Sequence, residues 1–183
     1  NPSGNVLFLI DVSGSMDTSF TLSTGEKMTR LDFVKAEISK TLNALGDSVQ
    51  FNVLSYARGI KIWQRYGLKK STKDNIASAV NFTNHLVAYD GTNIHSTLKL
   101  AWTFSGVNTI YLLTDGYPTD GVQDISTIVS DVKLWYAKTP IKINSIALLM
   151  GTDSSDDKPT SKKLMSALAE ATTGNYRVLE SDK

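Results

Sequence analysis

The strands are predicted from two patterns of apolar residues. Residues 6–10 are five apolar residues without a break, which is typical of a strand buried on both faces in a parallel sheet. Residues 49–56 and 60–63 alternate instead, and Arg58-Gly59 lies between them, so an antiparallel hairpin at a sheet edge is expected. Three further strands are predicted, over residues 109–113, 141–150 and 176–179.

Five segments between these strands carry apolar residues at helical spacing. The first has Leu31, Val34, Ile38, Leu42 and Leu45, and Gly46 follows as a stop signal. The second follows residues 71–74, whose spacing is that of a capping box with Asp in place of Glu. The other three have their apolar positions within residues 94–102, 125–135 and 164–169. Alternating strands and helices predict an α/β domain with a mostly parallel sheet and helices on both faces.

Composition narrows the classes of function. With 183 residues, the chain is expected to form one domain over residues 1–183, monomeric in isolation. Its formal net charge of +1 gives no basic surface for nucleic acid. It has no cysteine, which excludes disulfides and thiolate metal sites. No apolar run approaches the roughly 20 residues of a transmembrane helix, so direct membrane insertion is not expected.

The first strand ends in a group of oxygen-bearing side chains. Asp11 follows its last apolar residue, Ser13 and Ser15 come next at alternate positions, and Gly14 between them permits a sharp turn. A carboxylate and two hydroxyls on one tight loop are hard oxygen donors of the kind that Mg2+ prefers. These three residues are therefore candidate ligands of a divalent cation.

Residues 11–15, Asp-Val-Ser-Gly-Ser, match the D-x-S-x-S motif, and the chain resembles the von Willebrand factor type A domain over nearly its whole length. Residues 90–93, Asp-Gly-Thr-Asn, resemble the threonine loop of this family, and residues 111–116 resemble its aspartate loop. The resemblance implies a Rossmann-like, doubly wound sheet of six strands in the order 3-2-1-4-5-6, with strand 3 antiparallel. It also implies a metal-ion-dependent adhesion site with the ligands Asp11, Ser13, Ser15, Thr92 and Asp115.

The function implied by this resemblance is a non-enzymatic protein-binding module. It would bind Mg2+, with Mn2+ or Ca2+ as alternatives, and a protein partner would offer an acidic side chain to the ion. The strand order places the ends of strands 1 and 4 at the switch point, where open α/β sheets bind ligands. The loops expected around the ion are residues 17–29, 116–121 and 151–159. The family favours an extracellular or cell-surface location.

The same residues allow other interpretations. One is a scaffold domain of a larger assembly, such as a metal chelatase. Another is a Mg-dependent phosphohydrolase of the dehalogenase type, which needs a second acidic residue two positions after Asp11, where this chain has Ser13. A serine hydrolase would need a G-x-S-x-G elbow, and none surrounds Ser13 or Ser15. His95 is expected to be an ordinary surface or capping residue, and Asp153, Asp156 and Asp157 do not have the spacing of a calcium loop.

Overall fold

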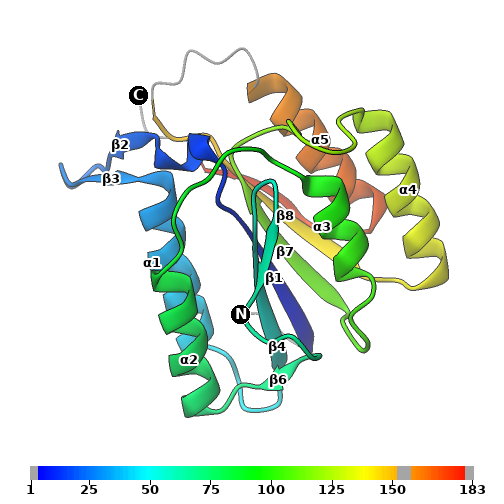
Figure 1. Ribbon diagram of the computed structural model, residues 1–183, viewed down its shortest axis with the longest axis horizontal. Coiled ribbons are helices and arrows are strands. Elements are labelled where there is room, and N and C mark those ends of the chain that lie inside the picture. The colour runs from blue at the N-terminus through cyan, green and yellow to red at the C-terminus, as the bar shows by residue number, and fades with distance from the viewer. Residues whose placement is uncertain (1–3, 152–157, 180–183) are drawn as a thin grey trace.

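A computed structural model describes residues 4–151 and 158–179 and shows one central sheet between two layers of helices (Figure 1). Its middle strand, β1 (Asn5–Asp11), pairs in parallel with β4 (Gln50–Tyr56) on one side and with β7 (Thr109–Thr114) on the other. Two more parallel strands follow β7, namely β8 (Lys142–Leu148) and β9 (Tyr176–Leu179). The antiparallel strand β5 (Ile60–Ile62) forms the opposite edge.

The order β5-β4-β1-β7-β8-β9 confirms the predicted order 3-2-1-4-5-6, including the antiparallel third strand. The sheet has a seventh strand, β6 (Lys69–Lys70), which pairs with the beginning of β4. Two residues are too short a segment to show a period, which explains why this strand was not predicted. Strand β8 is shorter than the predicted segment of residues 141–150.

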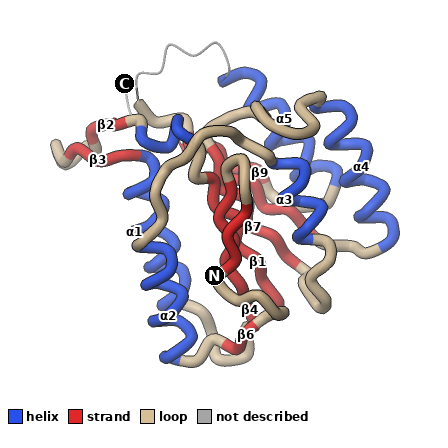
Figure 2. Tube along the Cα trace, in the orientation of Figure 1, coloured by secondary structure: helices blue, strands red, loops and turns tan. Residues whose placement is uncertain are grey.

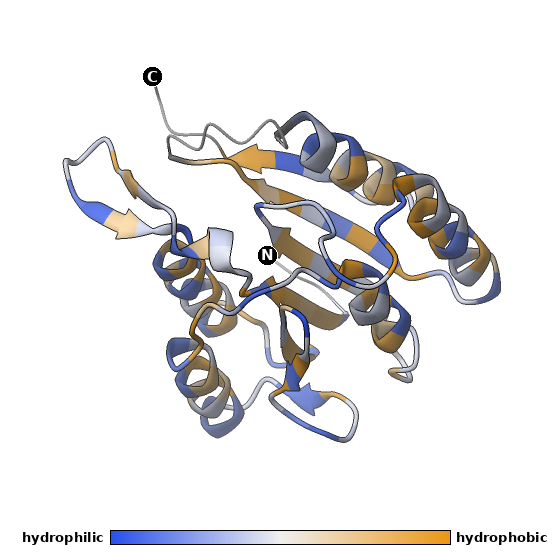
Figure 3. Cartoon of the chain, turned by 45° about the horizontal axis from the view of Figure 1, so that its top comes forward, coloured by the Kyte–Doolittle hydropathy of each residue, from blue (hydrophilic) through white to orange (hydrophobic). Residues whose placement is uncertain are grey.

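Each face of the sheet has its own helical layer and its own core (Figure 2). Helices α1 (Arg30–Asn43) and α2 (Lys73–Asn84) cover one face, and α3 (Ile94–Ala101), α4 (Ile125–Lys138) and α5 (Lys158–Ala171) cover the other. Val6, Phe8 and Ile10 of β1 belong to the first core, and Leu7 and Leu9 to the second. The unbroken apolar run in β1 is thus explained by burial on both faces (Figure 3). Within the described residues, no helix combines the length and apolarity required to cross a bilayer.

Residues 17–29, predicted to be a loop, contain a short hairpin that projects from the domain (Figure 1). A 3-10 turn, η1 (Gly14–Asp17), leads into β2 (Ser19–Thr21), which pairs antiparallel with β3 (Lys27–Thr29). Phe20 of β2 is buried in the first core, and its ring lies 5.9 Å from that of Phe33. The contact of Phe20 with the core stabilises this hairpin, and sequence periodicity does not report such a contact.

The start of α2 also differs from the prediction by one residue. Its N-cap is Thr72, whose side chain accepts from the backbone N–H of Asn75 at 3.3 Å. The hydroxyl of Ser71, the predicted cap, donates instead to the carbonyls of Gly46 at 2.6 Å and Val49 at 3.0 Å. Both residues have a suitable side chain, and the choice between them depends on this tertiary contact.

Gly174 provides a test of the packing between the turn after α5 and strand β8. A Cβ at Gly174 would lie 1.9 Å from the carbonyl oxygen of Ile143, so Gly174→Ala forces the backbone of two elements apart. We expect it to lower the free energy of unfolding by at least about 2 kcal/mol, measured by urea denaturation. Gly46→Ala is the control, because a Cβ there has no neighbour within 4 Å. Equal losses in the two variants would contradict this account.

Candidate metal centre

Four of the five predicted ligands form one hydrogen-bonded cluster. Asp11, at the end of β1, accepts from the backbone N–H of Ser13 at 2.7 Å. The hydroxyls of Ser13 and Ser15 lie 3.1 Å apart, within hydrogen-bond distance. The hydroxyl of Ser15 then donates to Asp115 Oδ1 at 2.8 Å, although 100 residues separate the two in sequence. The ends of β1 and β7 therefore bring two carboxylates and two hydroxyls together.

The first of these loops is held in shape from within the fold. The backbone N–H of Met16 donates to the carbonyl of Ser13 at 3.0 Å, which closes the 3-10 turn, and the Met16 side chain is fully buried. The second oxygen of Asp11 accepts from the hydroxyl of Thr114, the last residue of β7. Thr114 lies directly before Asp115 and is not one of the five predicted ligands.

Thr92, the fifth predicted ligand, lies beside this cluster but is not bonded to it. It is buried, and its side chain takes no part in the hydrogen bonds that join the other four residues. Its carbonyl accepts from the backbone N–H of Thr119 at 3.1 Å, which links it to the loop after β7. On the other side, the N–H of Tyr89 donates to the carbonyl of Val12 at 2.7 Å, which links the segment to the loop after β1.

Arg30 also belongs to the candidate site, although nothing in the sequence pattern distinguishes it. It is the first residue of α1, and its side chain is only 2% exposed. Its Nη1 donates to Asp115 Oδ2 at 2.7 Å, and its Nε donates to the carbonyl of Met150 at 2.6 Å. Nη1 also lies 3.4 Å from the carbonyl oxygen of Ser15. One guanidinium thus connects the loops that follow β1, β7 and β8.

The two carboxylates of the cluster lie in an unfavourable electrostatic environment. Burial, together with the negative charge of Asp115, raises the pKa of Asp11 to about 7, although hydrogen bonds from Thr114 and Ser13 oppose this shift. Burial also raises the pKa of Asp115, against the opposing effect of Arg30. When both carboxylates are ionised, Arg30 balances only one of them. The cluster therefore fits a hard cation, which would supply the missing positive charge.

The donor set suits a particular kind of ion. Among residues 4–151 and 158–179, no three His, Cys, Asp or Glu side chains are grouped as metal ligands usually are. A cation at this cluster would therefore depend on hydroxyl oxygens as well as the two carboxylates. Oxygen-only donors of this kind favour Mg2+, Mn2+ or Ca2+ over softer metals.

The other polar residues considered from the sequence do not join the cluster. His95 lies 2.8 Å from Asp131 on α4, measured from Nε2 to Oδ2, and its ring packs on Trp135. It is thus paired on the helical face, as an ordinary partly buried residue. Asp153, Asp156 and Asp157 lie outside the described residues.

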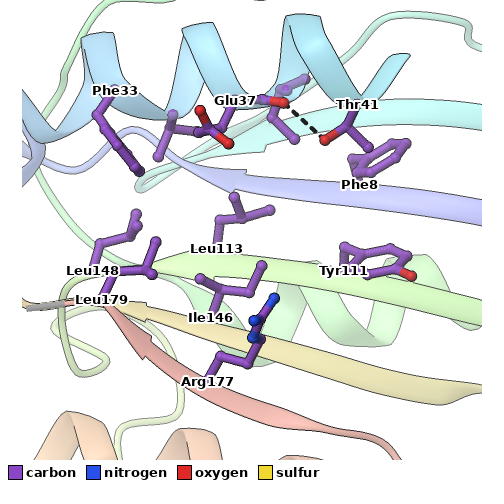
Figure 4. A pocket seen from close by; sticks show the side chains of 12 residues that line it. Phe8, Phe33, Glu37, Thr41, Tyr111, Leu113, Ile146, Leu148, Arg177 and Leu179 are labelled. Carbon is purple, nitrogen blue, oxygen red and sulfur yellow. Dashed lines mark hydrogen bonds between the residues drawn. The ribbon is translucent and has the colours of Figure 1, made fainter. Parts of the chain in front are cut away.

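A separate apolar groove of about 420 Å3 lies between α1 and the sheet (Figure 4). Phe33 of α1 and Leu113, Ile146 and Leu148 of the strands form its walls, and the main polar group among its strand residues is Arg177 of β9. None of the five predicted ligands lines this groove. The predicted ligands converge at the ends of the strands instead.

The fold and the cluster together define a class of protein, a doubly wound α/β domain with oxygen donors where the winding reverses between β1 and β7. Open α/β sheets bind their ligands at this switch point. The sequence profile of the von Willebrand factor type A domain matches residues 5–182, and the chain belongs to this family. The predicted family is thereby confirmed.

Similar proteins agree with this assignment. The chain is 31% identical to inter alpha-trypsin inhibitor heavy chain 4 of Mus musculus over 143 residues, which is 72% of this chain and 14% of that protein. It is 31% identical to the human von Willebrand factor A domain-containing protein 3A over 147 residues, 78% of this chain and 11% of that protein. Among solved structures, von Willebrand factor type A from Catenulispora acidiphila has a TM-score of 0.74 at 19% identity, over 97% of this chain and 38% of that chain, which shows the shared fold.

The raised pKa of Asp11 predicts how stability depends on pH in protein stripped of metal. Between its ordinary pKa of 3.8 and about 7, Asp11 holds its proton in the folded state and releases it in the unfolded chain. The folded state then binds more protons, so the free energy of unfolding falls as pH rises through this range, by roughly a few kcal/mol. Denaturation from pH 4 to 7 measures the slope.

Asp11→Asn has no such titration, and its slope should be shallower than that of the original protein. Asp47→Asn is the control, because Asp47 is an exposed residue between α1 and β4, and it should keep the original slope. Identical slopes in the original protein and in Asp11→Asn would show that Asp11 is not the group responsible.

Proposed function

We propose that this domain is a divalent-cation-dependent protein-binding module. Asp11, Ser13, Ser15, Thr92 and Asp115 would hold Mg2+, with Mn2+ or Ca2+ as alternatives, and a partner protein would offer a carboxylate to the bound ion. The observation that carries this proposal is the cluster in which Ser15 links the loop of Asp11 to the buried Asp115. Domains of this family mediate protein interactions, which supports the same assignment.

The charges of the cluster explain why a partner carboxylate is the expected additional ligand. Asp115 is already paired with Arg30, and the serine and threonine hydroxyls are neutral. The protein therefore neutralises a doubly charged ion incompletely, and a hard anionic oxygen is the group that best completes its coordination. Once bound, the cation supplies Lewis acidity toward that oxygen, and the residues of the chain fix its position.

The same surroundings support a non-enzymatic role. Ser13 and Ser15 have carboxylates as neighbours but no imidazole, because His95 is paired with Asp131 and His85 Nδ1 lies 2.8 Å from the carbonyl of Asn81. The Ser–His pairing that commonly activates a serine nucleophile is therefore not formed by either histidine. The compared relatives contain this domain within far longer chains, so their whole-protein activities are not transferred to it.

The first prediction from this function concerns Mg2+ itself. A cation that binds only the folded state raises the free energy of unfolding by RT ln(1 + [L]/Kd), about 2.7 kcal/mol at a hundredfold excess over Kd. Mg2+ should therefore raise the melting temperature, and Asp11→Ala should abolish both this rise and the heat of binding in titration calorimetry. Asp47→Ala should retain both. If Asp11→Ala bound Mg2+ with wild-type affinity, the assignment of the metal site to this cluster would be wrong.

The second prediction concerns the partner. The immobilised domain is used to capture proteins from a native extract in Mg2+. Those that a chelator releases are the candidate partners. In the true partner, changing one Glu or Asp to its amide should weaken binding strongly, because the amide offers no anionic oxygen to the ion. If capture does not depend on Mg2+, or if no amide substitution weakens it, the carboxylate mechanism is wrong and a scaffold role becomes the better explanation.

A further inference from the structure

A pocket of about 470 Å3 opens beside the candidate metal centre. It lies where β4 ends and turns into β5, and the segment before Thr92 closes its other side. Val12, Ala57 and Ile60 provide apolar walls, whereas Ser55, Lys61 and Tyr89 provide polar groups. None of the residues predicted to hold the cation lines this pocket, so it is distinct from the metal centre.

The pocket and the metal centre share their boundary. Val12 lies between Asp11 and Ser13, and its carbonyl accepts from the backbone N–H of Tyr89 at 2.7 Å. Asp90, which also lines the pocket, points toward the loop of the candidate ligands, since a Cβ on Gly14 would lie 3.9 Å from its Oδ1. A partner bound at the metal centre would therefore have this pocket beside it.

Ser55 gives the pocket a buried polar group that lacks a bond. Its side chain is 1% exposed, and its hydroxyl has no hydrogen-bond partner within the described residues. A buried hydroxyl without a partner lowers stability, so a ligand that bonds to it recovers this loss on binding. The hydroxyl of Ser55 is therefore a position at which a ligand atom is favoured.

Lys61 adds a positive charge at the same place. It is the register partner of Ser55 across the antiparallel β4–β5 pair, so both side chains lie on one face of the sheet. Its Nζ donates to the hydroxyl of Tyr89 at 3.0 Å and lies 4.5 Å from the centre of that ring. An ammonium has three donors, so Lys61 keeps donors for a ligand. With Arg58 and Asp90, the lining has two cationic side chains and one acidic side chain.

We propose that this pocket is a second carboxylate-binding subsite, which takes an acidic side chain of the partner close to the one that reaches the metal. Binding of an acidic side chain in the pocket is inferred from the pocket itself. Its closeness to another acidic side chain at the metal rests on the proposed function. The carboxylate accepts from the Ser55 hydroxyl and the Lys61 ammonium, while Val12, Ala57 and Ile60 contact the methylene groups of a Glu side chain. The partner surface is therefore predicted to carry two neighbouring acidic residues.

The test uses nuclear magnetic resonance of the labelled domain with N-acetylglutamate amide as the probe and N-acetylglutamine amide as its neutral match. In chelator, the acidic probe should shift the amide signals of residues 55–61 and 89–90 in a saturable way, and the neutral probe should not. The substitutions Ser55→Ala and Lys61→Gln should each raise the dissociation constant of the acidic probe by about tenfold, the loss expected for one charge-assisted hydrogen bond. Lys99→Gln, an exposed lysine of α3, is the matched control and should bind as the original protein does.

Equal binding of both probes, or unchanged binding in Ser55→Ala and Lys61→Gln, would overturn the subsite. A second titration in Mg2+, with the capped peptide Glu-Gly-Glu, separates this outcome from failure of the metal centre. Two engaged subsites should make this peptide bind more tightly than Gln-Gly-Glu or Glu-Gly-Gln. If Mg2+ does not shift the amide signals of residues 11–15 and 115 while the acidic probe shifts those of the pocket, the proposed function is wrong and the subsite is supported.

Discussion

The buried ion pair between Arg30 and Asp115 is the interaction on which the rest of the site depends. A buried charge is costly unless it is paired and hydrogen-bonded, so neither residue is tolerated there without the other. Because Arg30 also bonds to the carbonyl of Met150 and approaches that of Ser15, the pair fixes the relative positions of three strand ends. It also sets the charge of the site, since one guanidinium is placed against two carboxylates. The geometry of the site and its uncompensated negative charge thus have the same source.

Sequence periodicity predicted the main strands because the sheet is buried on both faces. Alternate residues of β1 belong to opposite cores, so the strand needs an apolar residue at every position, and the sequence shows this directly. The elements that were missed are short ones, β2, β3 and β6, which have two or three residues each. They form because Phe20 reaches the core and because β4 leaves an edge open, and neither fact is local in sequence. The order of the strands came from the family resemblance and not from the pattern.

The candidate site was predictable only in part, for a related reason. Asp11, Ser13 and Ser15 follow one another closely, so their convergence can be read from a single loop. Arg30 gave no signal, because a basic residue at the start of an amphipathic helix is usually solvated, and only tertiary packing buries it. Ser55 is a similar case, since nothing in an alternating strand distinguishes a hydroxyl with a partner from one without. Motifs thus report the loops of the candidate ligands, and the structure adds the groups that position them.

The central place of β1 also has a kinetic consequence. Val6 pairs with Phe51 on one side and with Thr109 on the other, so both parallel ladders join segments that are far apart in the chain. Pairings of this kind form slowly, because the chain loses loop-closure entropy before the contacts that stabilise the pairing are made. The cluster exists only after the β1–β7 ladder has formed, so a cation that bound there would come too late to assist the search for this pairing. Its effect would fall on the rate of unfolding, so a bound cation prolongs the lifetime of the folded domain without hastening its formation.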